Sequence, residues 1–305
     1  MTTIIPHTSV ASASRGPTVP SWVDRDAFPF QSRFLEVASG HRVHYVDEGE
    51  GDPVVFVHGT PTWSFEWRHL IRAFSPSHRC VAIDNLGFGL SDRPLDFGYT
   101  PESHSSVLRA FIERLGLTNI TLVVHDFGGP IGLPLALDTP GLVRRVVIMN
   151  TWMWSFADDP DMARKARIAG GAFGRFLYRY ANFSLRVLMP HAFGDRRALT
   201  RRIHEQYLAP FRDIDARSRV LWTLAKALLG SSAHYDRLWQ QRERLAALPA
   251  LVIWGTRDPA FETPQLARWR SILPRATVVE LDVGHWPQEE APDAVIQAMR
   301  SFLTV

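Results

Sequence analysis

Short apolar runs alternate along the chain with stretches of helical periodicity. Six runs have the continuous apolar character of strands covered on both faces: residues 54–57, 80–83, 122–124, 144–149, 251–254 and 277–281. Two earlier runs, at 33–38 and 41–46, flank Ser39-Gly40 and predict a β-hairpin. Because helical patterns separate most of the runs, we expect an α/β fold, with a mostly parallel eight-stranded sheet and helices on both faces.

The pattern changes between residues 151 and 247, where helix periodicity dominates and no strand is predicted. We expect a helical cap inserted at 151–247 into a core made of residues 21–150 and 248–305. Within the insertion, Phe173, Phe176, Leu177 and Tyr180 follow the i, i+3, i+4, i+7 spacing of one helix face. We interpret this stripe as buried packing against the neighbouring domain.

The composition is that of a folded domain with little net charge. The chain has 305 residues, of which 46% are hydrophobic and 21% charged, and its 34 basic residues nearly balance 31 acidic ones. We therefore expect no nucleic-acid partner. No run reaches the roughly 18 apolar residues of a membrane span, so we expect no membrane partner and a cytoplasmic protein; a homodimer is left open.

The cysteine content, the composition of the first 20 residues and the cofactor motifs each add an expectation. The single cysteine, Cys80, lies in a predicted core strand, which excludes an intrachain disulfide and indicates a buried thiol. Residues 1–20 are rich in Ser, Thr and Pro, and we expect them to form a flexible leader. No histidine–carboxylate spacing indicates a metal, and Gly87-Phe88-Gly89 lacks the rest of a dinucleotide fingerprint. We expect no cofactor.

The stretch from Leu122 to Gly132 predicts a strand, a tight turn and a helix start. This geometry is the nucleophile elbow, which lifts one side chain above the carboxyl edge of a sheet. Here the lifted residue is Asp126. Taken alone, Asp126 could equally serve as the N-cap of the following helix.

Two further residues favour catalysis. The carboxyl ends of parallel strands gather ligands and functional groups. Asp258 follows the run at 251–254, and His285 follows the run at 277–281. A nucleophile at the elbow, then an acid, then a histidine is the order of the hydrolase catalytic triad. We therefore predict Asp126, Asp258 and His285 as catalytic residues.

Several motifs together resemble the α/β-hydrolase superfamily, and within it the haloalkane dehalogenases and their epoxide-hydrolase relatives. The resemblance spans residues 28 to 290 and is weakest in the cap. The matching motifs are Phe28-Pro29-Phe30, His44-Tyr45-Val46-Asp47-Glu48-Gly49, His58-Gly59-Thr60-Pro61-Thr62-Trp63-Ser64-Phe65, Asp84 with Gly87-Phe88-Gly89-Leu90-Ser91-Asp92, the elbow, Trp254-Gly255-Thr256-Arg257-Asp258, and Gly284-His285.

The resemblance implies a two-step hydrolysis without a cofactor. The Asp126 carboxylate, ionised at neutral pH, attacks an sp3 carbon and forms an alkyl-enzyme ester. His285, oriented by Asp258, then activates the water that hydrolyses the ester. The backbone N–H groups of Thr60 and Phe127 are the expected oxyanion-hole donors. The implied substrate is small and apolar.

The sequence departs from the dehalogenase pattern at the leaving-group site. Haloalkane dehalogenases resemble one another in offering the halide two side-chain N–H donors, and this chain has Phe127 and Thr60 at the usual positions. Aromatic residues elsewhere are candidates for the leaving-group site or the pocket lining. They are Trp63, Trp152, Trp154, Tyr207 and Trp222.

Three alternatives to dehalogenation stay open. Epoxide hydrolases protonate the opening oxygen with cap tyrosines, and Tyr178, Tyr180, Tyr207 and Tyr235 are available. The segment Tyr207-Leu208-Ala209-Pro210-Phe211 resembles a cap segment found in dehalogenases and in β-lactone decarboxylases, which allows attack on a strained lactone. A catalytically silent, ligand-binding α/β-hydrolase is the third alternative, although such a protein has no need for a complete triad.

Overall fold

The structure, a computed structural model, describes residues 19–37 and 40–304. Its centre is one sheet with the strand order β1-β2-β4-β3-β5-β6-β7-β8. Strand β2 is antiparallel to β1 and β4, and the remaining pairs are parallel. The strands are β1 (Arg33–Glu36), β2 (Arg42–Glu48), β3 (Pro53–Val57), β4 (Arg79–Ile83), β5 (Ile120–Asp126), β6 (Val143–Thr151), β7 (Ala250–Gly255) and β8 (Thr277–Leu281).

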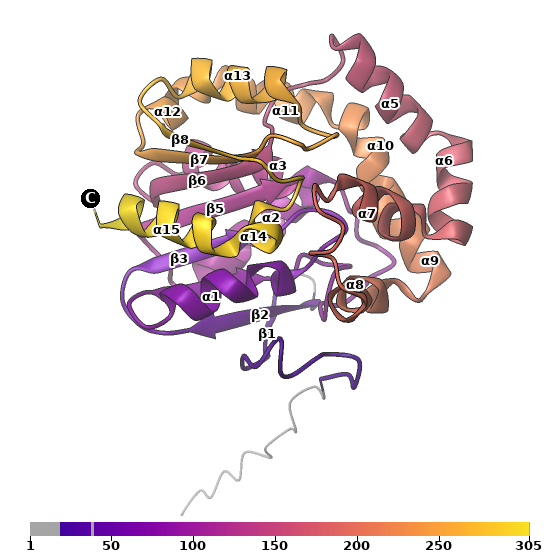
Figure 1. Ribbon diagram of the computed structural model, residues 1–305, viewed down its shortest axis with the longest axis horizontal. Helices are drawn as coiled ribbons and strands as arrows, with labels where there is room; N and C mark the ends of the chain where they lie inside the picture. Colours follow the sequence, from indigo (N-terminus) through magenta and orange to yellow (C-terminus); the bar gives the residue numbers. More distant parts are fainter. Residues whose placement is uncertain (1–18, 38–39, 305) are drawn as a thin grey trace, which may run out of the picture.

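Helices outside the insertion cover both faces of the sheet. In Figure 1, α1, α14 and α15 lie in front of the sheet, and α2 and α3 lie behind it. These arrangements give the parallel strands the double cover that their apolar sequences require. The helices are α1 (Arg68–Phe74, preceded by a 3₁₀ turn at Ser64–Trp67), α2 (Pro101–Arg114), α3 (Gly128–Gly132), α4 (Pro134–Asp138), α13 (Thr263–Ile272), α14 (Pro287–Glu290) and α15 (Pro292–Leu303).

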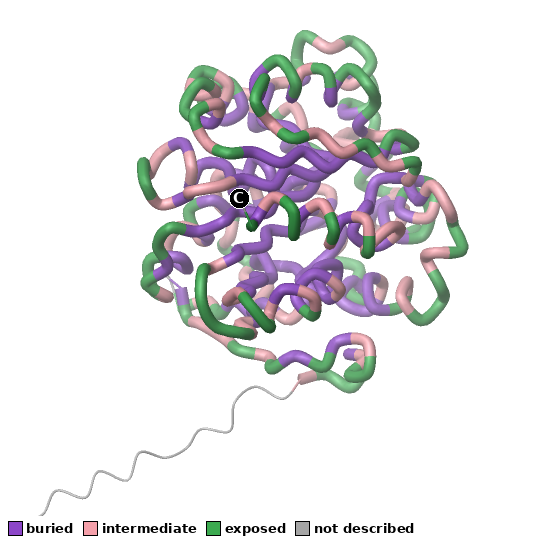
Figure 2. The backbone as a smooth tube through the Cα atoms, turned by 60° about the vertical axis from the view of Figure 1, so that its left-hand side comes forward, coloured by how far each residue is buried: buried purple, intermediate pink, exposed green. Residues whose placement is uncertain are grey.

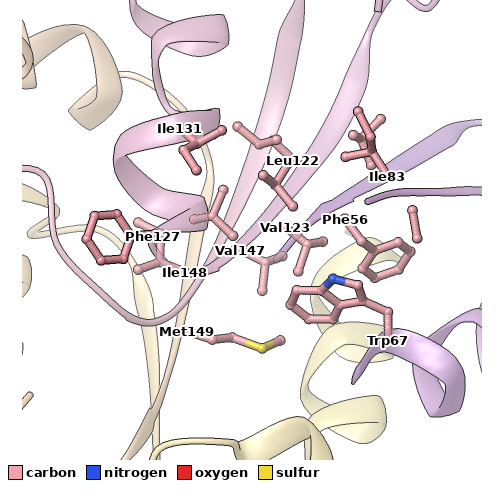
Figure 3. Close-up of a cluster of buried hydrophobic side chains, with 14 of the residues drawn as sticks. Phe56, Trp67, Ile83, Leu122, Val123, Phe127, Ile131, Val147, Ile148 and Met149 are labelled. Atoms are coloured by element: carbon pink, nitrogen blue, oxygen red, sulfur yellow. The ribbon is translucent and has the colours of Figure 1, made fainter. Parts of the chain in front are cut away.

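The central strands form the core. All seven residues of β5 are buried, and successive side chains point to opposite faces of the sheet. Figure 3 shows Val123 of this strand beside Phe56, Trp67 and Met149 on one face. The rings of Phe56 and Trp67 have their centroids 5.3 Å apart. This packing holds the carboxyl end of β5, where Asp126 lies, in its position in the sheet.

Between β6 and β7 lies a segment without strands, residues 152–249, which we call the helical insertion. Most of it occupies the side of the molecule beyond the carboxyl ends of the parallel strands, on the right in Figure 1, and its last two helices return along the top of that view. Its elements are α5 (Pro160–Gly170), α6 (Ala172–Phe176), π turns at Leu177–Ala181, Ser184–Leu188 and Arg217–Leu221, α7 (Met189–Ala192), α8 (Arg201–Leu208), a 3₁₀ turn at Ala209–Phe211, α9 (Ile214–Ala216), α10 (Trp222–Gly230), α11 (Ser232–Gln240) and α12 (Arg242–Ala246).

The predicted core stripe of the insertion is wrong. Phe173, Phe176 and Tyr180 are 66%, 57% and 60% exposed, and Leu177 is half-buried. The buried positions are one residue further along, at Gly174 and Tyr178. Phe173 and Phe176 lie in α6 before the π turn at residues 177–181, so the longer repeat of that turn changes the facing only of Leu177 and Tyr180. Figure 2 shows how exposed and buried segments divide over the surface.

The predicted α/β architecture with its eight strands is confirmed. Residues 1–18 of the expected leader and Ala38 of the expected hairpin lie outside the described residues. The division into a core and a separate cap stays a prediction. Over residues 19–37 and 40–304, none of the helices has the length and apolar character needed to cross a membrane.

Candidate active site

Asp126 stands at a sharp turn between β5 and α3. Its φ is +51°, a left-handed conformation that non-glycine residues adopt at a cost. The turn brings α3 close to the sheet: a Cβ atom on Gly128 would lie 2.1 Å from the carbonyl oxygen of Val57. Only glycine fits this approach. The strained turn carries the Asp126 side chain to the carboxyl edge of the sheet.

His285 and Asp258 meet Asp126 at that edge. The Nε2 atom of His285 lies 3.6 Å from Oδ2 of Asp126, and its Nδ1 atom lies 2.6 Å from Oδ2 of Asp258. All three side chains are buried. They come from the loops or strand ends of β5, β7 and β8, as the sequence predicts. The structure therefore brings the three predicted catalytic residues into one chain of contacts.

The charge state of His285 follows from its two carboxylate neighbours. Burial disfavours the imidazolium, but the charges of Asp258 and Asp126 and their hydrogen bonds outweigh it and raise the pKa of His285 to about 10. The resting site therefore holds a protonated His285 between two carboxyl groups at neutral pH.

The loop after β3 contacts the other oxygen of Asp126. The backbone N–H of Thr60 donates to Oδ1 of Asp126 at 2.7 Å. Gly59 makes this approach possible, because a Cβ atom there would lie 2.2 Å from the same oxygen. Phe127, the second expected oxyanion-hole residue, follows Asp126 directly and lines the same cavity. The two oxygens of Asp126 thus have different surroundings.

Asn150 is a supporting residue whose contacts the sequence did not reveal. Its Nδ2 atom donates to Oδ2 of Asp258 at 2.8 Å, and its Oδ1 atom accepts from the N–H of Gly255. Asn150 therefore fixes Asp258 against His285. The available signal was a polar residue at the carboxyl end of a buried strand, but sequence alone could not tell that its partner was Asp258.

Asp126 opens into a mainly apolar cavity of about 190 Å³ between the sheet and the helical insertion. Trp152 and Trp286 line it, and their buried indole N–H groups have no hydrogen-bond partner among the described residues. Buried donors normally have partners, so these two indole N–H groups are exceptions next to the cavity. The remaining lining residues are Thr60, Pro61, Asp126, Phe127, Met162, Tyr178, Ser184, Leu188, Met189, Ala192, Ala225, Leu228, Ala260, Phe261 and His285.

Four of the five aromatic residues that the sequence offers as pocket candidates do not line this cavity. Trp63 donates to the carbonyl of Gln206, and Trp222 donates to the carbonyl of Gly171. Trp154 packs against Trp239 and Trp269. Tyr207 is buried and donates to Glu289, which also pairs with Arg68. These side chains have structural contacts of their own, and Trp152 alone of the five lines the cavity.

One of the four candidate tyrosines lines the cavity. Tyr178 is buried there, and burial together with the nearby Asp126 charge raises the pKa of its hydroxyl to about 12. Tyr180 is exposed, and Tyr235 donates to the carbonyl of Ala227. Tyr178 therefore stays protonated at neutral pH and keeps a hydroxyl hydrogen at the cavity.

No group of three or more His, Cys, Asp or Glu side chains over residues 19–37 and 40–304 is arranged to hold a metal ion. The polar groups at the cavity are instead a carboxylate, an imidazolium, backbone and indole N–H donors, and a phenol. This set suits displacement at carbon followed by hydrolysis.

Comparison with known proteins gives relatives over nearly the whole chain. Haloalkane dehalogenase 2 of Mycobacterium tuberculosis is 36% identical over 279 residues, which cover 90% of this chain and 96% of the relative. A Shewanella oneidensis protein named cis-3-alkyl-4-alkyloxetan-2-one decarboxylase is 35% identical over 288 residues, covering 90% and 89% of the two chains.

The solved structures agree with the sequence comparison. The crystal structure of haloalkane dehalogenase DatA from Agrobacterium tumefaciens superposes with a TM-score of 0.81 and 25% identity, covering 92% of this chain and 98% of that one. The family model described as alpha/beta hydrolase fold matches residues 52–292. The chain belongs to the alpha/beta hydrolase fold family and is a hydrolase with haloalkane dehalogenases and oxetanone decarboxylases among its relatives.

Proposed function

We propose that this hydrolase attacks an sp3 carbon of a small apolar substrate with the Asp126 carboxylate, as a haloalkane dehalogenase does. Oδ2 of Asp126 forms the bond to carbon while the carbon–halogen bond breaks and the halide leaves with the electron pair. The observation that carries the proposal is the pairing of Asp126 with His285 at 3.6 Å beside an apolar cavity, with Asp258 2.6 Å behind His285.

The second step is hydrolysis of the resulting ester. Forming the ester removes the charge of Asp126, so the pKa of His285 falls from its raised value in the resting site. Neutral His285 takes a proton from water, which adds to the ester carbonyl carbon of Asp126. The negative charge develops on Oδ1, to which the Thr60 N–H already donates. Collapse of this intermediate releases an alcohol and restores the carboxylate.

The indole groups of Trp152 and Trp286 support a halide as the leaving group. Neither N–H donor has a partner in the part of the chain that the structure describes, and both residues line the cavity beside Asp126. They offer a substitute for the donor that Phe127 lacks. We propose that residues 151–247 act as a cap, because Met162, Tyr178, Leu188 and Leu228 of the insertion complete the cavity.

One observation favours a second candidate, the opening of a strained oxygen ring. Tyr178 places a protonated hydroxyl at the cavity, and such a group can donate to the oxygen that leaves from an epoxide. A β-lactone is the related possibility, supported by the relative named an oxetanone decarboxylase. In both cases the attacking group is again Asp126.

Trapping the ester tests these proposals directly. We expect His285→Ala to accumulate an ester on the Asp126 peptide when incubated with 1-bromobutane, styrene oxide or a β-lactone, because the base for the second step is missing. Peptide mass spectrometry identifies which electrophile adds. The double variant Asp126→Ala/His285→Ala is the control and gains no mass. If no electrophile forms an adduct and the wild type turns none over, the proposal is wrong and a ligand-binding role is favoured.

A further inference from the structure

The helical insertion gathers most of the exposed large apolar side chains of the molecule. Eight such side chains are exposed over the described part of the chain, and six of them lie between residues 168 and 188. Phe176 and Tyr180 contact each other, with ring centroids 5.1 Å apart. The six are Ile168, Phe173, Phe176, Tyr180, Val187 and Leu188. Monomeric proteins rarely gather exposed apolar residues in this way unless the surface meets another phase or partner.

The same segment is strongly basic. From Met162 to Phe193 the sequence has six Lys or Arg residues and no Asp or Glu, in a chain whose net charge is only +3. Of these six, Arg167, Arg175 and Arg186 are exposed and form no ion pair with any residue in 19–37 or 40–304. We call the six apolar side chains and these three arginines the basic aromatic face.

A groove beside this face shares part of its wall with the active-site cavity. Its volume is about 680 Å³, and its apolar lining includes Ile168 and Leu188 of the basic aromatic face. The inner end shares six residues with the cavity beside Asp126. They are Met162, Tyr178, Leu188, Ala192, Leu228 and Ala260. The groove, which is also lined by Lys165, His191 and Glu262, and the cavity beside Asp126 are therefore adjacent and share one mainly apolar wall.

We propose that the basic aromatic face binds the surface of an anionic lipid bilayer. Aromatic and aliphatic side chains enter the boundary between headgroups and acyl chains, and arginines pair with anionic headgroups. Asp161, Glu262 and Asp215 pair with the other three basic residues of the segment, so the charge complement of such a surface is supplied by Arg167, Arg175 and Arg186. This is peripheral binding, and as a proposal it departs from the expectation that the protein has no membrane partner.

Lipid binding gives the groove a role that rests on the proposed function. Substrates for attack by Asp126 are apolar and concentrate in bilayers, and the groove then opens toward the phase that contains them. The binding itself needs neither Asp126 nor His285. Failure of the ester-trapping experiment and failure of lipid binding are therefore separate results.

Vesicle flotation tests the proposal with the full chain. We expect the wild type to float with vesicles made of equal parts phosphatidylcholine and phosphatidylglycerol, and to stay behind with phosphatidylcholine alone. The variant Phe173→Ser/Phe176→Ser/Tyr180→Ser should bind about tenfold or more weakly. The variant Arg167→Gln/Arg175→Gln/Arg186→Gln should lose a similar factor, and about 0.5 M NaCl should weaken wild-type binding in the same way.

Matched controls separate this face from general surface effects. Leu95→Ser removes an exposed apolar side chain elsewhere, and Arg33→Gln/Arg114→Gln/Arg300→Gln removes the same charge from other exposed positions. Both should bind vesicles like the wild type, and thermal melting should confirm that every variant is folded. Absence of flotation overturns the proposal. So does concentration-dependent dimerisation that the aromatic variant abolishes, because the face then binds a second copy of the chain.

Discussion

Asp126 and Asp258 both act on one imidazole, and their joint effect makes His285 sensitive to pH. The raised pKa of His285, about 10, means that the folded state binds a proton more tightly than the unfolded chain, where histidine titrates near 6.5. The stabilisation from this proton is complete below about pH 6.5 and is lost as the pH rises through about 10.

This linkage predicts a pH-dependent difference in stability between two proteins. The free energy of unfolding of the wild type minus that of His285→Ala should fall as the pH is raised from 6.5 toward 10, because the protonated imidazole loses its advantage. Urea unfolding at several pH values measures the free energy of unfolding of both proteins. A difference that stays constant over this range would show that the two carboxylates do not hold a proton on His285.

Trp152 supplies a second prediction at the scale of single residues. Replacing it by Phe keeps an aromatic ring in contact with Phe127 but removes the unpaired N–H. If that N–H receives the leaving halide, Trp152→Phe slows ester formation by roughly ten- to a hundredfold. Stopped-flow measurement of halide release checks this. Trp154→Phe is the matched control, because the Trp154 ring packs on Trp239 and Trp269 outside the cavity.

At the scale of elements, one buried carboxylate joins three helices. Glu289 of α14 pairs with Arg68 of α1 and accepts from Tyr207 of α8. Tyr207→Phe should therefore lower the free energy of unfolding by about 1.5–3 kcal/mol, the range for a hydrogen bond to a charged group, and leave ester formation unchanged. Chemical denaturation and adduct formation measure the two effects. Loss of ester formation at unchanged stability would instead make Tyr207 a proton donor of the reaction.

Elements also show where sequence reasoning succeeds and where it fails. The buried strands are read from their apolar runs, because a central parallel strand is covered on both faces wherever it occurs. The residues at their carboxyl ends, Asp126 and Asp258, follow from the same rule.

No comparable rule predicts which helix faces of the helical insertion are buried. The stripe at Phe173, Phe176 and Tyr180 has correct helical spacing, yet periodicity does not say whether another helix covers that face. The π turn that begins at Leu177 also breaks the 3.6-residue repeat. Trp63 and Trp154 show a related limit of sequence analysis. The residues around a tryptophan in the sequence do not tell whether its indole fills the core or lines a cavity.

At the scale of the whole molecule, buried and half-buried polar contacts join the insertion to the sheet at several separate places. Besides Tyr207 and Glu289, Glu290 accepts the backbone N–H groups of Gly284 and Asp195, which lie on the two sides of the boundary. The Trp63 indole donates across it to the carbonyl of Gln206.

These contacts predict one cooperative unfolding transition. Because the buried partners on one side lose their hydrogen bonds when the other side unfolds, we expect far-ultraviolet circular dichroism and tryptophan fluorescence to give the same midpoint in urea. Two separated transitions would contradict this and would mean that the predicted cap, residues 151–247, folds independently of the core.

The residues that line the cavity come from two parts of the chain, the sheet edge and the helical insertion. This division has a consequence for protein engineering. The sheet edge supplies Asp126 and His285, with Asp258 behind His285, whereas Met162, Leu188 and Leu228 come from the helical insertion, which contributes none of these three residues. A mutant library confined to these three positions should change which substrates are accepted without disturbing the reacting groups. Substrate range and chemistry are therefore open to separate selection, and new specificities can be sought in a chain whose proposed catalytic geometry stays fixed.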